Sequence, residues 1–318
     1  MNQIDWRGDM NTAIENRYIW LNGDIVHLPD AQINVLSPTS QFALNVFEGI
    51  RCYWNEKKRQ LFAFRLEEHY ARLHDSSKLL KLEDTYTTVE MKNALLSVVA
   101  KNQYQEDIAV RQTLFVEGFG SWSSRGPVGM FVAPIPKAKT SAEYNAKGLH
   151  CCVSSWQRIS ENSLSPRIKC GANYMNSRMA QLEAKDNGFD TTIFLNNKGT
   201  VSEGPGSCLF IIKDDKLITP LLTDSVLASI TRNTVITIAH DILKIPVEER
   251  SIDRTELYVC DEAFLCGSAM EITPVLSVDK YMIGNGKQGS ITKEIHGEYL
   301  EIVTGEREEY QNWLTPIY

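Results

Sequence analysis

The chain has 318 residues, of which 43% are hydrophobic and 23% charged, and its formal net charge is −7. This length favours two domains, and the apolar content is large enough to give each a buried core. Because acidic residues prevail and both signs are interspersed, the composition excludes the basic surface typical of a nucleic-acid-binding protein.

The spacing of cysteine and histidine indicates neither a metal site nor a disulfide framework. The seven cysteines are an odd number without a Cys-x-x-Cys pair, and the six histidines form no His-Glu-x-x-His pattern. The start of the chain, Met1–Trp6, has no basic or apolar leader, and no segment is long enough to span a bilayer. We therefore expect a cytoplasmic protein that binds no metal, membrane or nucleic acid.

The first half of the chain is predicted to be mostly strands. Asn22-Gly23 between two apolar runs is typical of a two-residue hairpin, and Thr87 with Glu90 forms a capping box at the start of a helix. Strands are expected at 18–21, 24–27, 49–54, 61–65, 108–116 and 128–134, and helices at 66–77 and 87–103.

The second half alternates more often between strands and helices. The run Pro134–Ser141, with two prolines and two lysines, is the best candidate for a linker before it. Strands are expected at 150–155, 191–195, 207–212, 216–219, 262–266 and 273–278, and helices at 172–187, 230–242 and 291–303. Because hairpins dominate, an α+β fold with sheets or barrels fits better than a doubly wound parallel sheet.

One glycine-rich run could be mistaken for a dinucleotide site. Gly284–Gly289 matches G-x-G-x-x-G and precedes an expected helix. A dinucleotide fold needs this fingerprint inside a βαβ unit, and here the chain ends soon after the helix. We therefore interpret the run as a surface loop.

Lys169 and Glu203 are candidates for cofactor chemistry. Lys169 lies in the run Arg167–Tyr174, and Glu203 in the glycine-rich run Ser202–Ser207. A lysine amine can form an imine with an aldehyde cofactor, and a separate carboxylate can pair with its pyridine nitrogen. Taken alone, the two residues also fit a solvated lysine and an ordinary turn.

Three segments could bind a phosphate group. Leu227–Arg232 opens an expected helix with hydroxyl residues, Gly267–Ala269 follows an expected strand, and Arg65 ends another. Phosphates bind to helix N-termini, hydroxyls and arginines. Each segment alone also fits a capping serine, a turn or a surface arginine. Together with Lys169 and Glu203 they predict a pyridoxal-phosphate site.

In this order, the motifs resemble the branched-chain aminotransferases among the fold-type-IV pyridoxal-phosphate enzymes, from about Arg17 to Gly305. The resemblance rests on Val46–Tyr53, Arg65–His69 with Arg72–His74, Lys169–Tyr174, Ser202–Gly204, Ile230–Arg232 and Gly267–Val275. It implies a small N-terminal α/β domain, a larger barrel-like domain, the cofactor pyridoxal 5′-phosphate, and a homodimer or higher homo-oligomer. We expect these parts at residues 1–136 and 147–318, with a linker at 137–146.

The resemblance also implies a role for each matched residue. Lys169 is the catalytic Schiff-base lysine, Glu203 lies at the pyridine nitrogen, and Tyr174 at the cofactor's 3-hydroxyl group. The implied phosphate ligands are Arg65, Ile230, Thr231 and Ser268. Phe47 forms a wall of the substrate pocket, Ala269 offers an N–H to the substrate carboxylate, and Arg111 binds the distal carboxylate of glutamate and 2-oxoglutarate. The implied reaction moves the amino group of a branched-chain or related L-amino acid to 2-oxoglutarate.

Several positions of the implied pocket depart from the common family pattern. Phe42 and Ala109 stand where the family commonly has tyrosines, and Gln112 replaces a proline after Arg111. The tyrosine usual in the interdomain loop has no counterpart at 137–140. Fewer hydroxyls and more space at Ala109 predict a wider pocket, so a bulkier or more polar donor stays open beside valine, leucine and isoleucine.

Two alternatives remain at this point. The first is a relative with the same fold but a different reaction: a D-amino-acid transaminase, an amine transaminase or an aminodeoxychorismate lyase. The second is a catalytically inactive binding protein on this scaffold, against which the intact Lys169, Glu203 and Arg65 argue.

Overall fold

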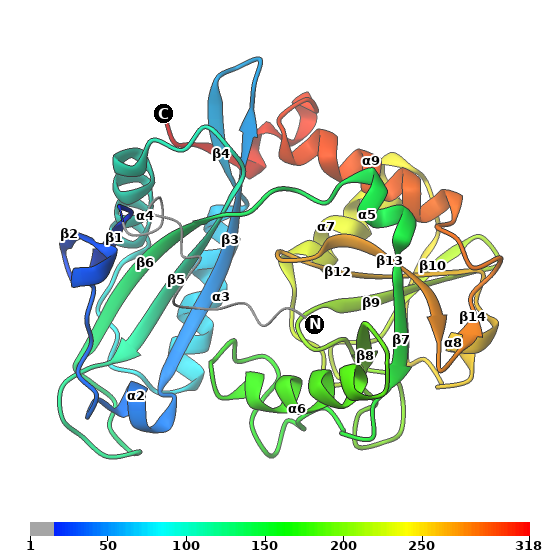
Figure 1. Ribbon diagram of the computed structural model, residues 1–318, viewed down its shortest axis with the longest axis horizontal. Helices are drawn as coiled ribbons and strands as arrows, with labels where there is room; N and C mark the ends of the chain where they lie inside the picture. The colour runs from blue at the N-terminus through cyan, green and yellow to red at the C-terminus, as the bar shows by residue number, and fades with distance from the viewer. Residues whose placement is uncertain (1–15) are drawn as a thin grey trace. The chain divides into compact units, whose positions relative to one another are not determined.

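The computed structural model describes residues 16–318 (Figure 1). The chain forms two compact units: the first ends at Lys137 and also includes Thr315–Tyr318, and the second comprises Ala138–Leu314. Each unit has its own β-sheet with helices beside it, which confirms the predicted α+β class. The expectation about Met1–Trp6 concerns residues outside the described range.

The first unit is built on a seven-stranded sheet with the order β15-β4-β3-β5-β6-β1-β2. The predicted hairpin at Asn22-Gly23 is confirmed, since both residues have positive φ (49° and 109°), as a two-residue turn between twisted strands requires. The strands are β1 (Tyr18–Leu21), β2 (Asp24–His27), β3 (Asn45–Asn55), β4 (Gln60–Phe64), β5 (Ile108–Val116), β6 (Val128–Pro136) and β15 (Leu314–Pro316).

Two long helices pack on this sheet, α3 (Leu66–Leu79) against β3 and α4 (Thr88–Asn102) against β1 and β6. The predicted capping box is present: the Thr87 hydroxyl accepts a hydrogen bond from the backbone N–H of Glu90, and the Glu90 carboxylate accepts one from the N–H of Thr87. Two short elements precede β3, η1 (Leu28–Asp30) and α2 (Pro38–Phe42).

The last residues of the chain belong to the first unit, although the sequence places them with the second domain. The backbone N–H of Ile317 donates to the carbonyl of Leu61 (3.0 Å), and the Tyr318 hydroxyl donates to the carbonyl of Tyr104 (2.9 Å). Pairing of β15 with β4 fixes the end of the chain on the first sheet. Spacing along the sequence cannot predict such a pairing between distant strands. The expected linker at 137–146 contains most of helix α5 (Ala142–Lys147). We propose that the linker between the two domains lies at residues 137–146.

The second unit is built on a mixed sheet with the order β11-β10-β9-β12-β13-β7-β8, and β14 pairs with β13. The central strands β9, β12 and β13 are antiparallel, whereas β7 runs parallel to both β13 and β8. The strands are β7 (Leu149–Val153), β8 (Thr191–Ile193), β9 (Cys208–Lys213), β10 (Lys216–Thr219), β11 (Val247–Glu249), β12 (Glu262–Gly267), β13 (Glu271–Val278) and β14 (Tyr281–Met282).

The helices of the second unit cover this sheet, with α7 and α9 against β12 and α6 against β8. A buried apolar cluster that includes Leu209, Ile211, Leu265 and Val275 forms the core. The predicted helix at 230–242 is α-helical only to Thr237 and ends as a π-helical turn. The helical elements are α6 (Asn173–Asp186), α7 (Ile230–Thr237), η2 (Ile238–Ile242), α8 (Glu256–Val259), α9 (Ser290–Val303) and η3 (Glu308–Trp313).

The glycine-rich run Gly284–Gly289 is a loop between β14 and α9, not part of a βαβ unit. The carboxylate of Glu262 already occupies the N-terminus of α9, where it accepts hydrogen bonds from the N–H groups of Ile291 (3.1 Å) and Thr292 (2.8 Å). A carboxylate in this place satisfies the donors that a pyrophosphate would need. The dinucleotide interpretation is therefore excluded on structural grounds as well.

Over residues 16–318, no helix is both long and apolar enough to cross a membrane. The same residues contain no group of three or more histidine, cysteine or acidic side chains placed to hold a metal ion. All seven cysteines are free and buried.

A buried ion cluster joins β3 to α3. Glu48 is fully buried, and its carboxylate accepts hydrogen bonds from Arg72 (2.8 and 2.7 Å) and lies 2.7 Å from His69 Nδ1. Burial by itself would raise the pKa of Glu48, but the charges and hydrogen bonds of Arg72 and His69 outweigh it and hold the pKa well below the ordinary 4.5. The cluster therefore fixes β3, which carries Phe47, against α3, which follows Arg65.

Replacing Glu48 with glutamine should lower the free energy of unfolding by about 3–5 kcal/mol, because it leaves the Arg72 charge buried without its counter-ion. Urea unfolding at pH 7 measures this loss. Glu67→Gln is the matched control, since its ion pair with Lys92 is exposed and is worth about 1 kcal/mol or less.

The same cluster predicts a pH dependence. A carboxylate with a lowered folded-state pKa contributes stability above its unfolded pKa of 4.5 and loses it as the pH falls below that value. The stability difference between the native protein and Glu48→Gln should therefore stay constant from pH 7 down to about 4.5 and shrink at lower pH. A difference that stays constant well below pH 4.5 would contradict this account.

Candidate active site

Lys169 is held at the entrance to helix α6. Its neighbours Ile168 and Cys170 are buried, and the Asn173 side-chain amide donates to the carbonyl of Ile168 (2.8 Å). These contacts leave Lys169 half-buried, with its Nζ donating a hydrogen bond to the hydroxyl of Tyr174 (3.2 Å). The structure therefore brings together the amine and the phenol for which the resemblance implies neighbouring roles.

Glu203 is a buried carboxylate with a charge partner. Its Oε1 accepts a hydrogen bond from Arg158 Nε (2.8 Å), and its Oε2 accepts one from the backbone N–H of Leu227 (3.1 Å). Arg158 and Glu203 are only 7% and 4% exposed, so this is an ion pair inside the protein. A buried carboxylate that is paired with an arginine in this way can also face a second cationic group, such as a protonated pyridine nitrogen.

The turn after Glu203 lies against two other segments of the expected site. A Cβ atom on Gly206 would lie 4.0 Å from a ring carbon of Tyr174, and one on Gly267 would lie 3.2 Å from the carbonyl oxygen of Gly206. The turn thus has Tyr174 on one side, with ordinary room for a Cβ atom at 206. On the other side it approaches Gly267 closely, where a Cβ atom would crowd the backbone. Beside them, the Ser207 hydroxyl is buried without a hydrogen-bond partner among the described residues.

The phosphate candidates of this unit lie at a helix start and a turn. Ile230 and Thr231 are the first residues of α7, where the Ser229 hydroxyl caps the helix by accepting a hydrogen bond from the N–H of Arg232 (3.2 Å). The N–H groups of a first helical turn have no intrahelical acceptors and suit a phosphate. The Leu227 N–H contact to Glu203 ties this helix start to the buried carboxylate.

Ser268 and Ala269 lie in the tight turn between β12 and β13. The next residue but one, Glu271, has a positive φ (52°) and is fully buried. Its carboxylate accepts hydrogen bonds from the N–H (2.7 Å) and hydroxyl (2.6 Å) of Thr140. This anchor holds the turn in a conformation that a non-glycine residue adopts only with support from its surroundings.

In the first unit, the predicted substrate residues share one face of the sheet. In the register of β3 with β5, Phe47 is opposite Thr113 and Gly49 opposite Arg111, so Phe47 and Arg111 are diagonal neighbours. The Arg111 guanidinium lies over the Phe47 ring, 3.9 Å from its centroid. Ala109 is two residues from Arg111 and points to the same face.

Gln112 does not lie on this face, contrary to the expectation that it helps to reshape the pocket. It is fully buried in the core, where its amide donates to the carbonyl of Met91 (3.0 Å) and its oxygen accepts from the Tyr70 hydroxyl (3.1 Å). Alternation along a strand sends neighbouring side chains to opposite faces, so Gln112 must point away from Arg111. Of the two departures in β5, only Ala109 is on the face of Arg111.

The two remaining candidates lie at element ends. Phe42 is the exposed last residue of α2, just before β3. Arg65 sits between β4 and α3 in a left-handed conformation (φ 50°), is mostly buried, and donates from Nε to the Glu68 carboxylate (2.8 Å).

Arg158 is the residue of this site that the sequence analysis missed. It follows the end of β7 by five residues and belongs to none of the recognised motifs. Its partner Glu203 is 45 residues further along the chain. An arginine soon after an apolar strand is the only local signal, and many surface arginines share it.

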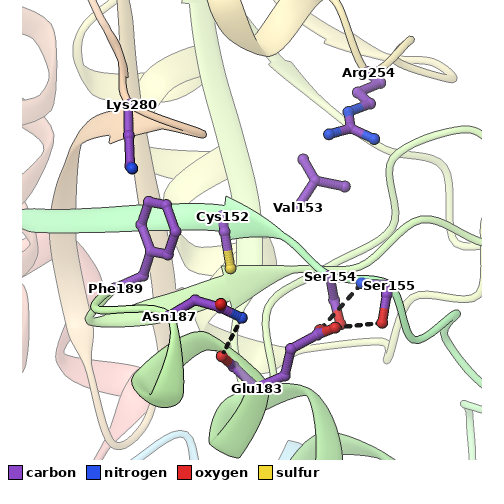
Figure 2. A pocket seen from close by; sticks show the side chains of 9 residues that line it. All are labelled: Cys152, Val153, Ser154, Ser155, Glu183, Asn187, Phe189, Arg254 and Lys280. Atoms are coloured by element: carbon purple, nitrogen blue, oxygen red, sulfur yellow. Dashed lines mark hydrogen bonds between the residues drawn. The ribbon is translucent and has the colours of Figure 1, made fainter.

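A separate pocket of about 370 Å³ lies at the end of β7 beside the last turn of α6 (Figure 2). Its lining includes Cys152, Phe189, Arg254 and Lys280, and none of the residues predicted for the cofactor. Figure 2 shows the Glu183 carboxylate bonded to Ser154 and Ser155, whose side chains point towards it. These polar groups are thus engaged in holding the β7 segment to the helix.

Comparison with known proteins identifies the class. The model of the family described as amino-transferase class IV matches residues 45–278. A probable branched-chain-amino-acid aminotransferase of Aquifex aeolicus (strain VF5) is 37% identical over 301 residues, which cover 95% of this chain and 97% of the relative.

Two solved structures are similar over almost the whole chain. The branched-chain amino acid aminotransferase from Thermobaculum terrenum in its PLP (holo) form is 41% identical, with a TM-score of 0.90 and coverage of 96% of this chain and 99% of that one. The branched-chain aminotransferase from the archaeon Thermoproteus uzoniensis with norvaline is 39% identical, with a TM-score of 0.89 and coverage of 95% and 99%.

The chain therefore belongs to the class IV aminotransferases. Within that class it belongs to the branched-chain aminotransferase family, which confirms the resemblance read from the motifs.

Proposed function

We propose that this protein is a pyridoxal-phosphate-dependent aminotransferase that moves the amino group of a branched-chain or related L-amino acid to 2-oxoglutarate. The similar proteins named above align with nearly the full chain, and each is named as a branched-chain aminotransferase. The observation that carries the proposal is the combination of the Lys169–Tyr174 contact with a buried, paired Glu203 in one unit.

The residues present fit pyridoxal phosphate. Lys169 offers an amine for the aldehyde carbon, Glu203 a buried carboxylate for the ring nitrogen, and Tyr174 a hydroxyl for the ring oxygen. In the second unit, the helix start at Ile230 and Thr231 and the hydroxyl of Ser268 supply donors of the kind that phosphates take. Arg65 of the first unit carries a guanidinium, which is also a common phosphate ligand. Gly267 has no side chain that would crowd the backbone of the turn after Glu203.

When bound, the cofactor supplies a conjugated ring that accepts electrons as the substrate loses its α-proton. The Nζ of Lys169 would take that proton from the substrate Cα and deliver it to the aldehyde-derived carbon of the cofactor, and its hydrogen bond to Tyr174 would orient the amine. Glu203 holds a proton on the ring nitrogen by its negative charge. The N–H of Ala269 receives the substrate α-carboxylate.

The apolar and acidic substrates would share the face of β3 and β5. Phe47 offers an aromatic surface to an aliphatic side chain, and Arg111 offers a guanidinium to a distal carboxylate. A guanidinium stacked on a ring keeps its edge available for a bidentate pair. Ala109 leaves room on this face for a side chain larger than that of valine.

Replacing Arg111 with alanine should lower kcat/KM for 2-oxoglutarate and glutamate far more than kcat/KM for the apolar donor. The expected loss in kcat/KM for the acidic substrates is about 1.5–3 kcal/mol, the cost of a lost charged hydrogen bond. Steady-state kinetics with both substrate types measures it. Arg59→Ala is the matched control, because Arg59 lies in the exposed turn between β3 and β4. Equal losses for both substrate types would contradict the assignment.

A panel of amino donors against 2-oxoglutarate tests the function as a whole. Valine, leucine and isoleucine should be accepted, with larger aliphatic or aromatic L-amino acids tolerated because of Ala109. The full-length similarity to branched-chain enzymes speaks against the alternatives. Activity only with D-amino acids or amines would instead favour a relative with another reaction, and no bleaching of the bound cofactor by any donor would favour an inactive binding protein.

The protein would act as a homo-oligomer in the cytoplasm. One face of α6 leaves Met175, Met179 and Leu182 exposed to solvent. Sequence periodicity groups these residues on one face, and an exposed apolar face of this kind is typical of a subunit interface. Light scattering should give at least twice the mass of the chain.

A further inference from the structure

Arg158 contacts Glu203 from within the protein. The Nε–Oε1 distance is 2.8 Å, and both side chains are more than nine-tenths buried. The second carboxylate oxygen is occupied by the N–H of Leu227. These two donors fix the plane of the carboxylate and supply one full positive charge beside it.

The guanidinium is itself held on its far side. Asn176 of α6 accepts a hydrogen bond from Arg158 Nη1 (3.4 Å) and another from the N–H of Ile159 (3.3 Å). The Asn176 amide group donates to the carbonyl of Gln157 (2.9 Å). The guanidinium also lies 5.9 Å from the centroid of the Phe194 ring.

The main chain around Arg158 is fixed as well. Its N–H donates to the carbonyl of Leu195 (2.9 Å), which anchors it after β8. Upstream, the Glu183 carboxylate of α6 accepts hydrogen bonds from the Ser154 hydroxyl (2.6 Å) and the Ser155 N–H (3.1 Å), as Figure 2 shows. Residues 154–159 are therefore attached at two places to the helix that follows Lys169.

We propose that Arg158 is a positioning residue that keeps Glu203 charged and aimed at the ring nitrogen of the cofactor. This inference rests on the proposed role of Glu203 and adds the group that makes the role possible.

The physical reason is a competition for one proton. A buried carboxylate that faces a protonated ring nitrogen can take the proton, because a neutral pair costs less to bury than two charges. A cation behind the carboxylate favours its charged form and so leaves the proton on the nitrogen. Arginine suits this task because its guanidinium stays protonated over the whole working pH range.

The test uses the holoenzyme loaded with pyridoxal phosphate labelled with ¹⁵N in the ring, whose chemical shift reports protonation of the nitrogen. In Arg158→Met the shift should move towards that of the neutral ring, and the single-turnover rate should fall by about 10²-fold, the lower end for a lost electrostatic contact to a reacting group. Arg158→Lys, which retains the charge, should restore most of the protonated shift. Arg250→Met, which breaks the Arg250–Glu256 pair away from the site, should match the native protein.

A double variant shows whether Arg158 acts through Glu203. In the Glu203→Gln background, Arg158→Met should add little further loss of rate, because the group it supports is already gone. If methionine prevents folding, as judged by circular dichroism of the apoprotein, Arg158→Gln takes its place with the same expected shift.

A protonated shift and a native rate in the folded Arg158 variant would overturn the proposal. Failure of the underlying site would look different. In that case Glu203→Gln alone would leave both the shift and the rate unchanged, and Arg158 would have nothing to support.

Discussion

Replacing Lys169 with alanine should abolish transamination while leaving the fold intact. Lys169 is the proposed partner of the cofactor aldehyde and the carrier of the α-proton, so its loss removes both roles at once. The proton transfer alone is worth about 10²–10⁴-fold, and the loss of the covalent attachment adds to it. Because the side chain is only half-buried and its amine donates a hydrogen bond to the Tyr174 hydroxyl at the surface of the site, its removal should cost little stability.

Two measurements separate loss of chemistry from loss of structure. Borohydride reduction followed by peptide mass analysis should find the cofactor attached to the Lys169 peptide in the native protein and to no peptide in the variant. Circular dichroism should be the same for both. Lys185→Ala is the matched control, since Lys185 is an exposed lysine in the last turn of α6. Near-normal turnover of the Lys169 variant would falsify the assignment.

Replacing Glu203 with glutamine should impair the chemical step more than cofactor binding. The amide has nearly the same shape but no negative charge, so it cannot hold a proton on the ring nitrogen. The expected loss in single-turnover rate is about 10²–10³-fold, comparable to removal of another buried electrostatic contact to a reacting group. Cofactor affinity should change less, because the proposed phosphate ligands Arg65, Thr231 and Ser268 are untouched.

The buried partner of Glu203 sharpens this prediction. With glutamine at 203, the Arg158 charge is left buried without its counter-ion, which should destabilise the apoprotein by about 3–5 kcal/mol. Rate and stability must therefore be measured on the same preparation, with equilibrium dialysis for the cofactor. A variant with a native single-turnover rate would show that Glu203 does not face the ring nitrogen.

Local signals predicted most of the secondary structure. The hairpin at Asn22-Gly23 and the capping box at Thr87 need only residues within four positions of one another, and both are present. Strand alternation likewise requires Gln112 to face away from Arg111, although its departure from the family pattern had suggested a pocket residue. Such features follow from backbone geometry and short-range hydrogen bonds, which can be predicted from neighbouring residues in the sequence.

Contacts between distant residues could not be predicted in this way. The Glu48–Arg72 pair joins residues 24 positions apart, and the Arg158–Glu203 pair joins residues 45 positions apart. Spacing along the chain does not say which strand lies beside which, so it does not say which charges meet. The return of Thr315–Tyr318 to the first sheet has the same cause.

The candidate site combines both kinds of information. The motifs around Lys169, Glu203, Ile230 and Ser268, met in order along the sequence, were sufficient to recognise the family and its cofactor. Only the tertiary structure showed that Glu203 is buried against Arg158, and that Arg111 stacks on Phe47. Residue identity determines which chemistry a side chain can perform, whereas its burial and charge partners depend on the packing of segments far apart in the chain.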